Sequence, residues 1–273
     1  MRGNIRKFGL LSFLLAVFLS LAAQDAVFIP ASVQAMGNTV VSLPLSSGFE
    51  LNPAAAGAAP FELGMAYSSR FMLKELSEAS AYAIAPLLGS TLQFGFSRFG
   101  ETAYRETQFS FGVAKTLGKY FSGGLRMQYF TLAMAENDQR PGLLTFSLGV
   151  QYNRRLWGIG ASVFNPLEQS MHKANFEKQY PSVYRLGLHR LFNNILVFSS
   201  ALSLQSGEKL NSHWGIECRF PGRFVARAGL ETSNSTWSLG VGWVFATVHA
   251  DLSYRYHQYL GSSPSVTLYF RKQ

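Results

Sequence analysis

Cysteine is nearly absent from the sequence: Cys218 is the only one among 273 residues. An internal disulfide is therefore excluded, and Cys218, on the apolar side of residues 213–220, is expected to act as a small hydrophobic side chain. Acidic residues are also few, 15 against 24 lysines and arginines, which gives a net charge of +9. The basic residues are scattered singly, without the clustered patch that nucleic-acid binding needs. We therefore expect no nucleic-acid partner.

Long hydrophobic runs are missing after residue 23. Arg2, Arg6 and Lys7 precede residues 9–23, GLLSFLLAVFLSLAA, an uncharged stretch that ends in small residues. It falls short of the roughly 20 residues of a membrane-spanning helix, so a signal peptide at 1–23 is favoured over a transmembrane anchor. Its removal would lower the net charge from +9 to +6, because 9 − 3 = 6. Since no later segment could form a membrane helix, any membrane crossing must use strands.

Patterns typical of catalysis or metal binding are missing as well. His249, Asp251 and Ser253 share one face of a strand, but they are spaced too regularly to single out as a catalytic triad. No group of residues has the spacing of metal ligands. We therefore predict a protein that is not an enzyme and has no cofactor.

The sequence is rich in alternation between apolar and polar residues. In residues 235–257, STWSLGVGWVFATVHADLSYRYH, the apolar positions recur with a period of two, which is the period of a strand. The same pattern continues from residue 61 to the end without a helical period or a linker. We predict fourteen strands, at 61–70, 80–85, 90–99, 104–115, 119–132, 142–153, 155–164, 182–191, 194–205, 211–220, 223–232, 235–244, 246–257 and 264–271.

The predicted connections alternate between long loops and short turns. Long loops at one end and tight turns at the other are typical of bacterial outer-membrane barrels, whose short turns lie in the periplasm. Acidic residues follow the same division, because nine of them lie in or beside the predicted long loops: Glu75, Glu78, Glu101, Glu106, Glu136, Asp138, Glu168, Glu177 and Glu208.

The alternation alone does not say which face of the strands meets the solvent. In a soluble barrel the aromatic side chains would overfill the interior, and the many glycines would cover the surface poorly. In a membrane barrel the apolar face meets lipid, and closure leaves no unpaired strand edge. We therefore predict an all-β fold, a closed antiparallel transmembrane barrel that comprises residues 61–273 and lies in the outer membrane of a Gram-negative bacterium.

The polar face of the last strands is unusually ionic. Charges of both signs alternate there, so that neighbouring strands can pair them. A lattice of ion pairs that stiffens the wall is favoured over a substrate or ion pathway. Its predicted members are His213, Glu217, Arg219, Arg227, Glu231, His249, Asp251 and Arg255.

Residues 24–60 lack the alternation of a wall strand and are rich in small residues. We predict that this segment tucks into the barrel lumen. Its run MGNTVVSLPLSSGFELNPAAAG, with Met36, Gly37, Asn52 and Pro53, resembles the N-terminal signature of FadL-related fourteen-stranded outer-membrane proteins. Within that group, the size and the C-terminal pattern are most similar to the PorV and PorQ family of the Bacteroidetes type IX secretion system. The sequence departs from that family's pattern in two places, because residues 42–48 carry no acid and the last residues are Arg-Lys-Gln. Membership of the neighbouring PorP and SprF group is therefore an alternative.

The resemblance implies a barrel that binds secreted cargo or a secretion protein at its outer rim. Two loops are the candidates for such a contact, 71–78 and 165–181, and the first is unusually apolar for an exposed loop. The predicted contact residues are Phe71, Met72, Leu73, Leu76, Asn165 and Pro166. Folding of the first loop over the lumen as a lid, and an ordinary solvated loop for the second, are the alternatives.

The resemblance also implies a competing function, FadL-like uptake of hydrophobic small molecules. Such uptake requires an apolar site inside the barrel and a route past the N-terminal segment. The ionic strands argue against an apolar tunnel on their side, whereas Phe99, Phe130 and Phe164 point inward elsewhere in the predicted wall. A purely structural barrel is a third possibility.

Overall fold

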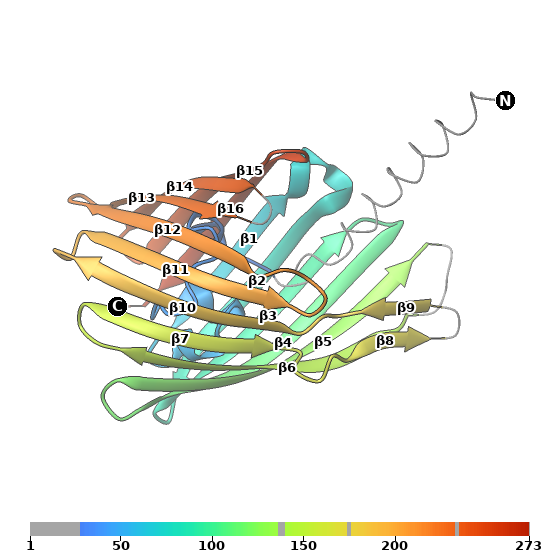
Figure 1. Ribbon diagram of the computed structural model, residues 1–273, viewed down its shortest axis with the longest axis horizontal. Helices are drawn as coiled ribbons and strands as arrows, with labels where there is room; N and C mark the ends of the chain where they lie inside the picture. The colour runs from blue at the N-terminus through green and yellow to red at the C-terminus, as the bar shows by residue number, and fades with distance from the viewer. Residues whose placement is uncertain (1–27, 136–139, 174–175, 233–234, 273) are drawn as a thin grey trace.

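The wall of the molecule is a single closed sheet (Figure 1). The computed structural model describes residues 28–135, 140–173, 176–232 and 235–272. Within these ranges fourteen antiparallel strands form a closed barrel, and the first wall strand pairs with the last. The strands of the wall are β1 (Glu62–Ser69), β2 (Ser77–Leu87), β3 (Ser90–Gly100), β4 (Tyr104–Leu117), β5 (Phe121–Met134), β6 (Gly142–Asn153), β7 (Trp157–Phe164), β10 (Val183–Phe192), β11 (Leu196–Gln205), β12 (Asn211–Phe220), β13 (Phe224–Glu231), β14 (Thr236–Phe245), β15 (Val248–His257) and β16 (Gly261–Arg271).

The predicted fourteen-stranded barrel is confirmed, and each predicted strand overlaps one wall strand. The sequence missed one element. The connection between β7 and β10 contains a two-stranded hairpin, β8 (Ser170–Lys173) and β9 (Phe176–Gln179), which we call the loop hairpin. Its strands are only four residues long and carry charges, so they show too little alternation to be recognised.

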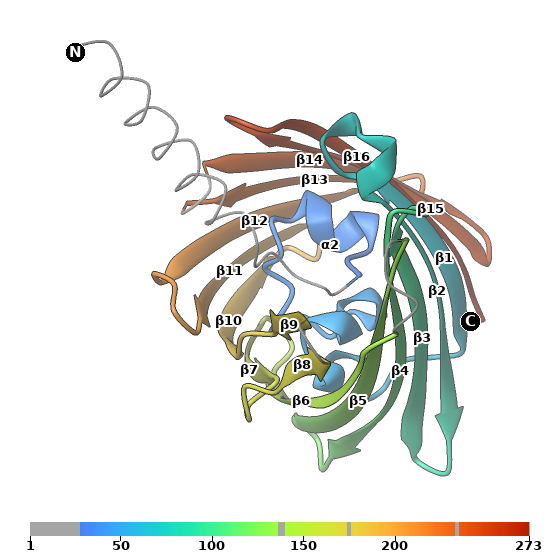
Figure 2. The same ribbon diagram turned by 90° about the vertical axis from the view of Figure 1, so that its right-hand side faces the viewer.

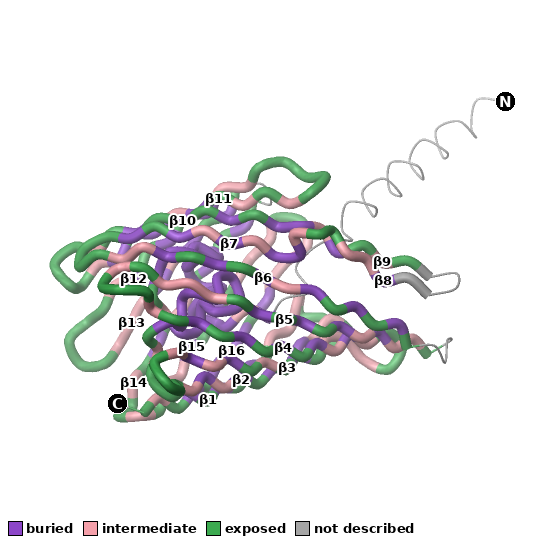
Figure 3. The backbone as a smooth tube through the Cα atoms, turned by 90° about the horizontal axis from the view of Figure 1, so that it is seen from below, coloured by how far each residue is buried: buried purple, intermediate pink, exposed green. Residues whose placement is uncertain are grey.

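The two faces of the wall differ in chemistry. Large apolar side chains point outward and are exposed, as in Leu63 and Met65 of β1 and Leu186 and Leu188 of β10. Serine, threonine and glutamine side chains point inward, and Figure 3 shows the resulting alternation of buried and exposed positions along the strands. An exposed apolar face that runs around the whole wall defines a transmembrane β-barrel. The predicted outward orientation of the apolar face is therefore confirmed.

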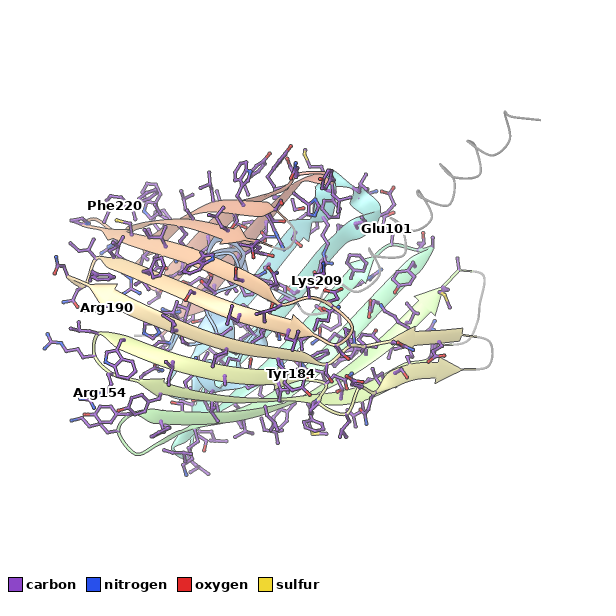
Figure 4. The ribbon with its side chains drawn as sticks, in the orientation of Figure 1. Glu101, Arg154, Tyr184, Arg190, Lys209 and Phe220 are labelled. Atoms are coloured by element: carbon purple, nitrogen blue, oxygen red, sulfur yellow. The ribbon has the colours of Figure 1, made fainter. Side chains whose placement is uncertain are left out.

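The connections divide the barrel into two ends. Short turns, such as the one between Leu87 and Ser90, lie at one end, which we call the short-turn end. The longer connections and the loop hairpin lie at the other, the long-loop end. Figure 4 shows Arg154, Arg190 and Phe220 at the short-turn end and Glu101 and Lys209 toward the long-loop end.

Residues 28–60, which we call the luminal segment, lie within the ring of strands (Figure 2). The segment contains one helical turn, α2 (Ala31–Ala35), and two 3-10 turns, η1 (Ser46–Glu50) and η2 (Pro53–Ala56). No helix in the described part of the chain is long and apolar enough to cross a membrane. The predicted signal peptide and residues 24–27 lie outside the described residues, and the domain boundaries at 23 and 60 stay predictions.

Candidate functional site in the barrel lumen

Glycines bring the wall into close contact with the luminal segment. Seven inward-facing glycines on seven strands form what we call the glycine belt: Gly124, Gly149, Gly160, Gly187, Gly215, Gly229 and Gly240. A Cβ atom on Gly229 would lie 2.2 Å from the Gly37 nitrogen, and one on Gly124 would lie 2.5 Å from the Pro53 carbonyl carbon. Only glycine permits such an approach of two backbones. The belt explains why glycines recur on the polar face of the strands.

Three pairs of belt glycines lie opposite each other on neighbouring strands, and β11 contributes no glycine to the belt. Gly124 pairs with Gly149, Gly160 with Gly187, and Gly215 with Gly229 across neighbouring strands. The luminal segment follows this track around the wall, from Ala35 against Gly240 to Pro53 against Gly124. The segment is thereby seated against much of the inner circumference.

All four residues of the N-terminal motif lie at this contact. Met36 is fully buried, and Gly37, with a φ of 63°, packs against Gly229. Asn52 is fully buried, and its Nδ2 donates to the carbonyl oxygens of Val41 (2.7 Å), Val150 (3.2 Å) and Ala161 (3.4 Å).

The same Asn52 side chain also caps η2, since its Oδ1 accepts a hydrogen bond from the Ala54 N–H at 3.0 Å, with Pro53 at the first position of the turn. Val150 and Ala161 face each other on β6 and β7, so Asn52 joins the luminal segment to the seam between these two strands.

A buried ion pair that the sequence analysis missed fastens the segment to β5. Arg126 Nη2 donates to Glu50 Oε2 at 2.5 Å, and Arg126 Nη1 donates to the Phe49 carbonyl oxygen at 3.3 Å. Both side chains are shielded from water. A charge at such a position is tolerated only with its partner. The inward position of Arg126 follows from the alternation in β5, but its pairing with a residue 76 positions earlier does not.

The predicted ionic lattice consists of two separate networks and two histidines. Arg227 bridges Glu217 (2.7 Å) and Asp251 (2.6 Å), and Glu217 also accepts from Arg219 (2.8 Å). Closer to the long-loop end, Glu231 accepts from Arg255 (2.7 Å) and from Asn38 of the luminal segment (3.1 Å).

His213 lies 2.9 Å from the Gly37 carbonyl oxygen, whereas His249 stacks on Tyr269. The structure therefore brings six of the eight predicted residues into two networks, and the two histidines make the contacts just given. Within the described residues, no group of three or more histidine, cysteine or acidic side chains could hold a metal ion.

A compact apolar cluster lies inside the barrel toward the long-loop end. Its members come from β5, β6, β7, the loop hairpin and the start of β10: Phe130, Leu132, Leu143, Phe164, Met171, Tyr180 and Val183. The ring of Phe130 packs against those of Tyr180, at 4.9 Å between centroids, and Phe164, at 6.3 Å. Two other apolar clusters inside the barrel, around Phe49 and Tyr82 and around Met36 and Val197, include the luminal segment, whereas this one is formed by the wall and the connection between β7 and β10 alone.

The loop hairpin region covers the apolar cluster and is held there by polar contacts with β4. Lys178 Nζ lies 2.8 Å from Glu106 Oε2, and the Tyr180 hydroxyl donates to the same carboxylate. Burial alone would lower the pKa of Lys178, but Glu106 and Tyr104 raise it above its ordinary value. The Lys178 ammonium is therefore charged at neutral pH, and its contact with Glu106 lies at one edge of the cluster.

Asn165 and Pro166, which were predicted to contact a partner, differ in position. Asn165 is fully buried, has a φ of 48° and donates to the carbonyl oxygens of Gln169 and Tyr180. It anchors the base of the connection that carries the loop hairpin. Pro166 is half-buried. A partner contact through these residues stays a prediction.

The other predicted contact loop lies on two short 3-10 turns, η3 (Arg70–Met72) and η4 (Lys74–Leu76). Met72 is 70% exposed and Leu73 is 49% exposed, whereas Phe71 and Leu76 are half-buried. Phe71 donates its backbone N–H to Ser263 Oγ at 2.9 Å and packs edge-on against His257. The loop is therefore fixed to the rim beside β15 and β16 with two apolar side chains exposed.

A small polar cavity opens beside the luminal segment on the side of β10 to β13. It measures about 60 Å³, and Asn38, Arg185, His213, Glu231 and Arg255 are among its lining residues. This volume suits a few water molecules rather than an organic ligand. The cavity adjoins the apolar cluster, because Val183 belongs to both.

The fold and the lumen together define a transmembrane β-barrel that encloses its own N-terminal segment. No family model matches the chain, and no curated protein does either. Among solved structures, the Pseudomonas putida toluene transporter TodX is similar with a TM-score of 0.68 at 11% identity, over 91% of this chain and 97% of that one.

Two further barrels give comparable matches. The Ralstonia pickettii toluene transporter TbuX is similar with a TM-score of 0.64 at 12% identity, over 92% of this chain and 100% of that one. A Pseudomonas aeruginosa FadL homologue is similar with a TM-score of 0.62 at 9% identity, over 90% of this chain and 100% of that one. At these identities the matches show the fold, which is the fourteen-stranded barrel of FadL-type channels.

Proposed function

We propose that the protein is an outer-membrane channel for the uptake of a small apolar molecule, such as a monoaromatic hydrocarbon. The observation that carries the proposal is the apolar cluster around Phe130 and Tyr180, which lies inside the barrel next to the long-loop end and does not include the luminal segment. The short turns of outer-membrane barrels lie in the periplasm, so the cluster would face molecules that arrive from outside. The neighbours of the same fold are described as toluene transporters and a FadL homologue, which supports this function.

The route beyond the apolar cluster is constrained by the luminal segment. Since the segment is seated along the glycine belt, a molecule that travels straight through must displace it. A second path would lead sideways between β6 and β7, where Asn52 binds the carbonyl oxygens of both strands, and it requires the ladder between these strands to part. On the outer face of this seam lies an apolar groove of about 510 Å³, lined by Leu148, Val150, Ala161 and their neighbours. An apolar molecule that left there would enter the membrane without crossing the ionic networks.

We expect the substitution Leu143→Asn to reduce uptake of radiolabelled toluene at least about tenfold in intact cells, whose lipopolysaccharide leaflet slows the direct entry of apolar molecules. Leu143 is a buried member of the apolar cluster, and an unpaired amide there opposes entry of an apolar ligand. The control is Ser203→Asn, on the polar side of the lumen beside the small cavity, which should leave uptake near that of the wild type. Equal uptake by the wild type and Leu143→Asn, with both barrels folded, would contradict the proposal.

A second candidate function is a contact with secreted cargo or a protein of a PorV/PorQ-type secretion apparatus. The exposed Met72 and Leu73 support it, because apolar side chains held at a rim often mark a contact site. Affinity purification from the native membrane of the wild type and of a Met72→Ser/Leu73→Ser variant tests it. Recovery of secretion proteins with the wild type alone would favour this function, and their absence from both would leave uptake as the better account.

A further inference from the structure

The two ends of the barrel differ in the exposed charges of the described residues, because cations without exposed acids lie at the short-turn end, whereas both signs occur at the long-loop end. A group of exposed cations, which we call the basic collar, lies at the short-turn end. The cations lie in three turns, near the ends of two strands and at the C-terminal end of the chain. The members of the collar are Lys115, Lys119, Arg154, Arg155, Arg190, Arg223 and Lys272. Figure 4 shows Arg154 and Arg190 extending from this end away from the wall. The exposed acids of the described chain that lie in loops belong to the long-loop end, among them Glu75, Glu168, Glu177 and Glu208.

Acidic side chains near the short-turn end do not neutralise the collar. The described acids in that half of the barrel, Glu50, Glu62, Glu217 and Asp251, are buried and already paired with arginines inside the lumen. None of these arginines belongs to the collar. The collar therefore presents a net positive charge to the solvent and to the membrane surface at its level.

Two collar cations contact the same aromatic ring. The Lys119 ammonium and the Arg154 guanidinium both lie over the Tyr120 ring, at 5.4 and 4.6 Å from its centroid. Arg154 also donates to the Tyr152 hydroxyl at 3.3 Å. The ring thus fixes two cations at the short-turn end, and each of them is of the kind that pairs with a phosphate group.

The collar lies where it can contact lipid headgroups, because part of it is on the lipid-facing side of the wall. Lys115 and Arg190 occupy outward-facing positions of β4 and β10, in line with the lipid-facing Val113 and Leu188. Arg190 lies opposite Trp157 in the ladder, and the Trp157 ring packs on Tyr152 at 5.6 Å. Outward aromatic residues of this kind mark the interface between hydrocarbon and headgroups. The cations beside them are therefore at the level of lipid phosphates.

We propose that the basic collar binds the phosphate groups of anionic phospholipids in the periplasmic leaflet, with Lys119 and Arg154 as its strongest site. This inference rests on the membrane orientation given above and not on the uptake of any substrate. The attraction adds up over several cations that face one lipid surface and weakens as salt screens it. A soluble acidic partner would have no need of cations on the lipid-facing side of the wall.

Native mass spectrometry of the detergent-purified barrel with added phosphatidylglycerol or phosphatidylethanolamine tests the proposal. The collar variant carries Lys119→Gln, Arg154→Gln, Arg155→Gln and Arg190→Gln. The control variant carries Lys74→Gln and Lys209→Gln, two exposed cations at the long-loop end. All three barrels are first shown to be folded by the shift of their gel mobility on heating.

The wild type and the control should retain phosphatidylglycerol over phosphatidylethanolamine by at least about fivefold, and the collar variant should lose this preference. Equal retention of both lipids by the wild type would overturn the proposal. So would the same preference in the collar variant. Binding of polyglutamate by the wild type without any lipid preference would overturn it in favour of a soluble acidic partner.

Discussion

Replacing Arg126 with methionine should lower the free energy of unfolding by about 3–5 kcal/mol, because it leaves the Glu50 carboxylate buried without a partner. Within the described residues Arg126 is the ion-pair partner of Glu50, and both side chains are shielded from solvent. The guanidinium also lies 5.4 Å from the centre of the Phe49 ring and donates to the Phe49 carbonyl oxygen. A single substitution thus removes several contacts between the luminal segment and β5.

Reversible urea unfolding of the barrel in lipid vesicles measures this loss. The double variant Arg126→Met/Glu50→Leu should recover most of it, since both charges are then gone. Arg255→Met is the matched control, because Arg255 is partly exposed and its partner Glu231 keeps the hydrogen bond from Asn38. We expect Arg255→Met to lower the free energy of unfolding by only about 1–2 kcal/mol. An Arg126→Met barrel as stable as the wild type would mean that water reaches Glu50, and that the segment is not packed in the lumen.

Replacing Gly124 with valine should open the barrel to ions. Its Cβ would lie 2.5 Å from the Pro53 carbonyl carbon and 2.6 Å from the Ala54 nitrogen, which are backbone atoms that cannot rotate away. Overpacking of this kind costs about 1–3 kcal/mol or more, and the luminal segment is the part that can yield. Displacement of the segment from the glycine belt would leave a continuous path along a lumen lined by polar side chains.

Conductance in planar lipid bilayers shows this opening directly. Gly123→Val is a strict control, because Gly123 is the preceding residue of the same strand and its Cβ would meet only one side-chain atom, at 3.8 Å. We expect the conductance of Gly124→Val to rise at least about tenfold above that of the wild type, while Gly123→Val stays closed. Equal conductance of the three barrels would show that the glycine belt does not seat the segment.

Much of the wall could be predicted from the sequence because strand alternation is a local signal. In β12, His213, Gly215 and Glu217 alternate with Trp214, Ile216 and Cys218, and the two sets face the lumen and the lipid respectively. The loop hairpin was missed because four-residue strands carry too few positions to show a period.

The contacts inside the lumen were beyond sequence reasoning for a different reason. Glu50 and Arg126 are 76 residues apart, and no local pattern determines how the luminal segment is placed against the wall. The same holds for Asn52 and the seam between β6 and β7. The glycine belt could have been recognised in the sequence, since Gly215, Gly229 and Gly240 occupy inward positions of three successive strands.

The most direct test of the account is to ask which medium meets each face of one strand. In a Cys218→Ser background, spin labels at Leu202→Cys and Ser203→Cys on β11 are compared for collisions with oxygen, which concentrates in lipid, and with a water-soluble nickel complex. Leu202 is exposed on the outer wall, and Ser203 lines the polar cavity. We expect the label at 202 to meet oxygen and the label at 203 to meet nickel. The opposite assignment, or nickel access at both positions, would contradict a barrel with lipid outside and water within.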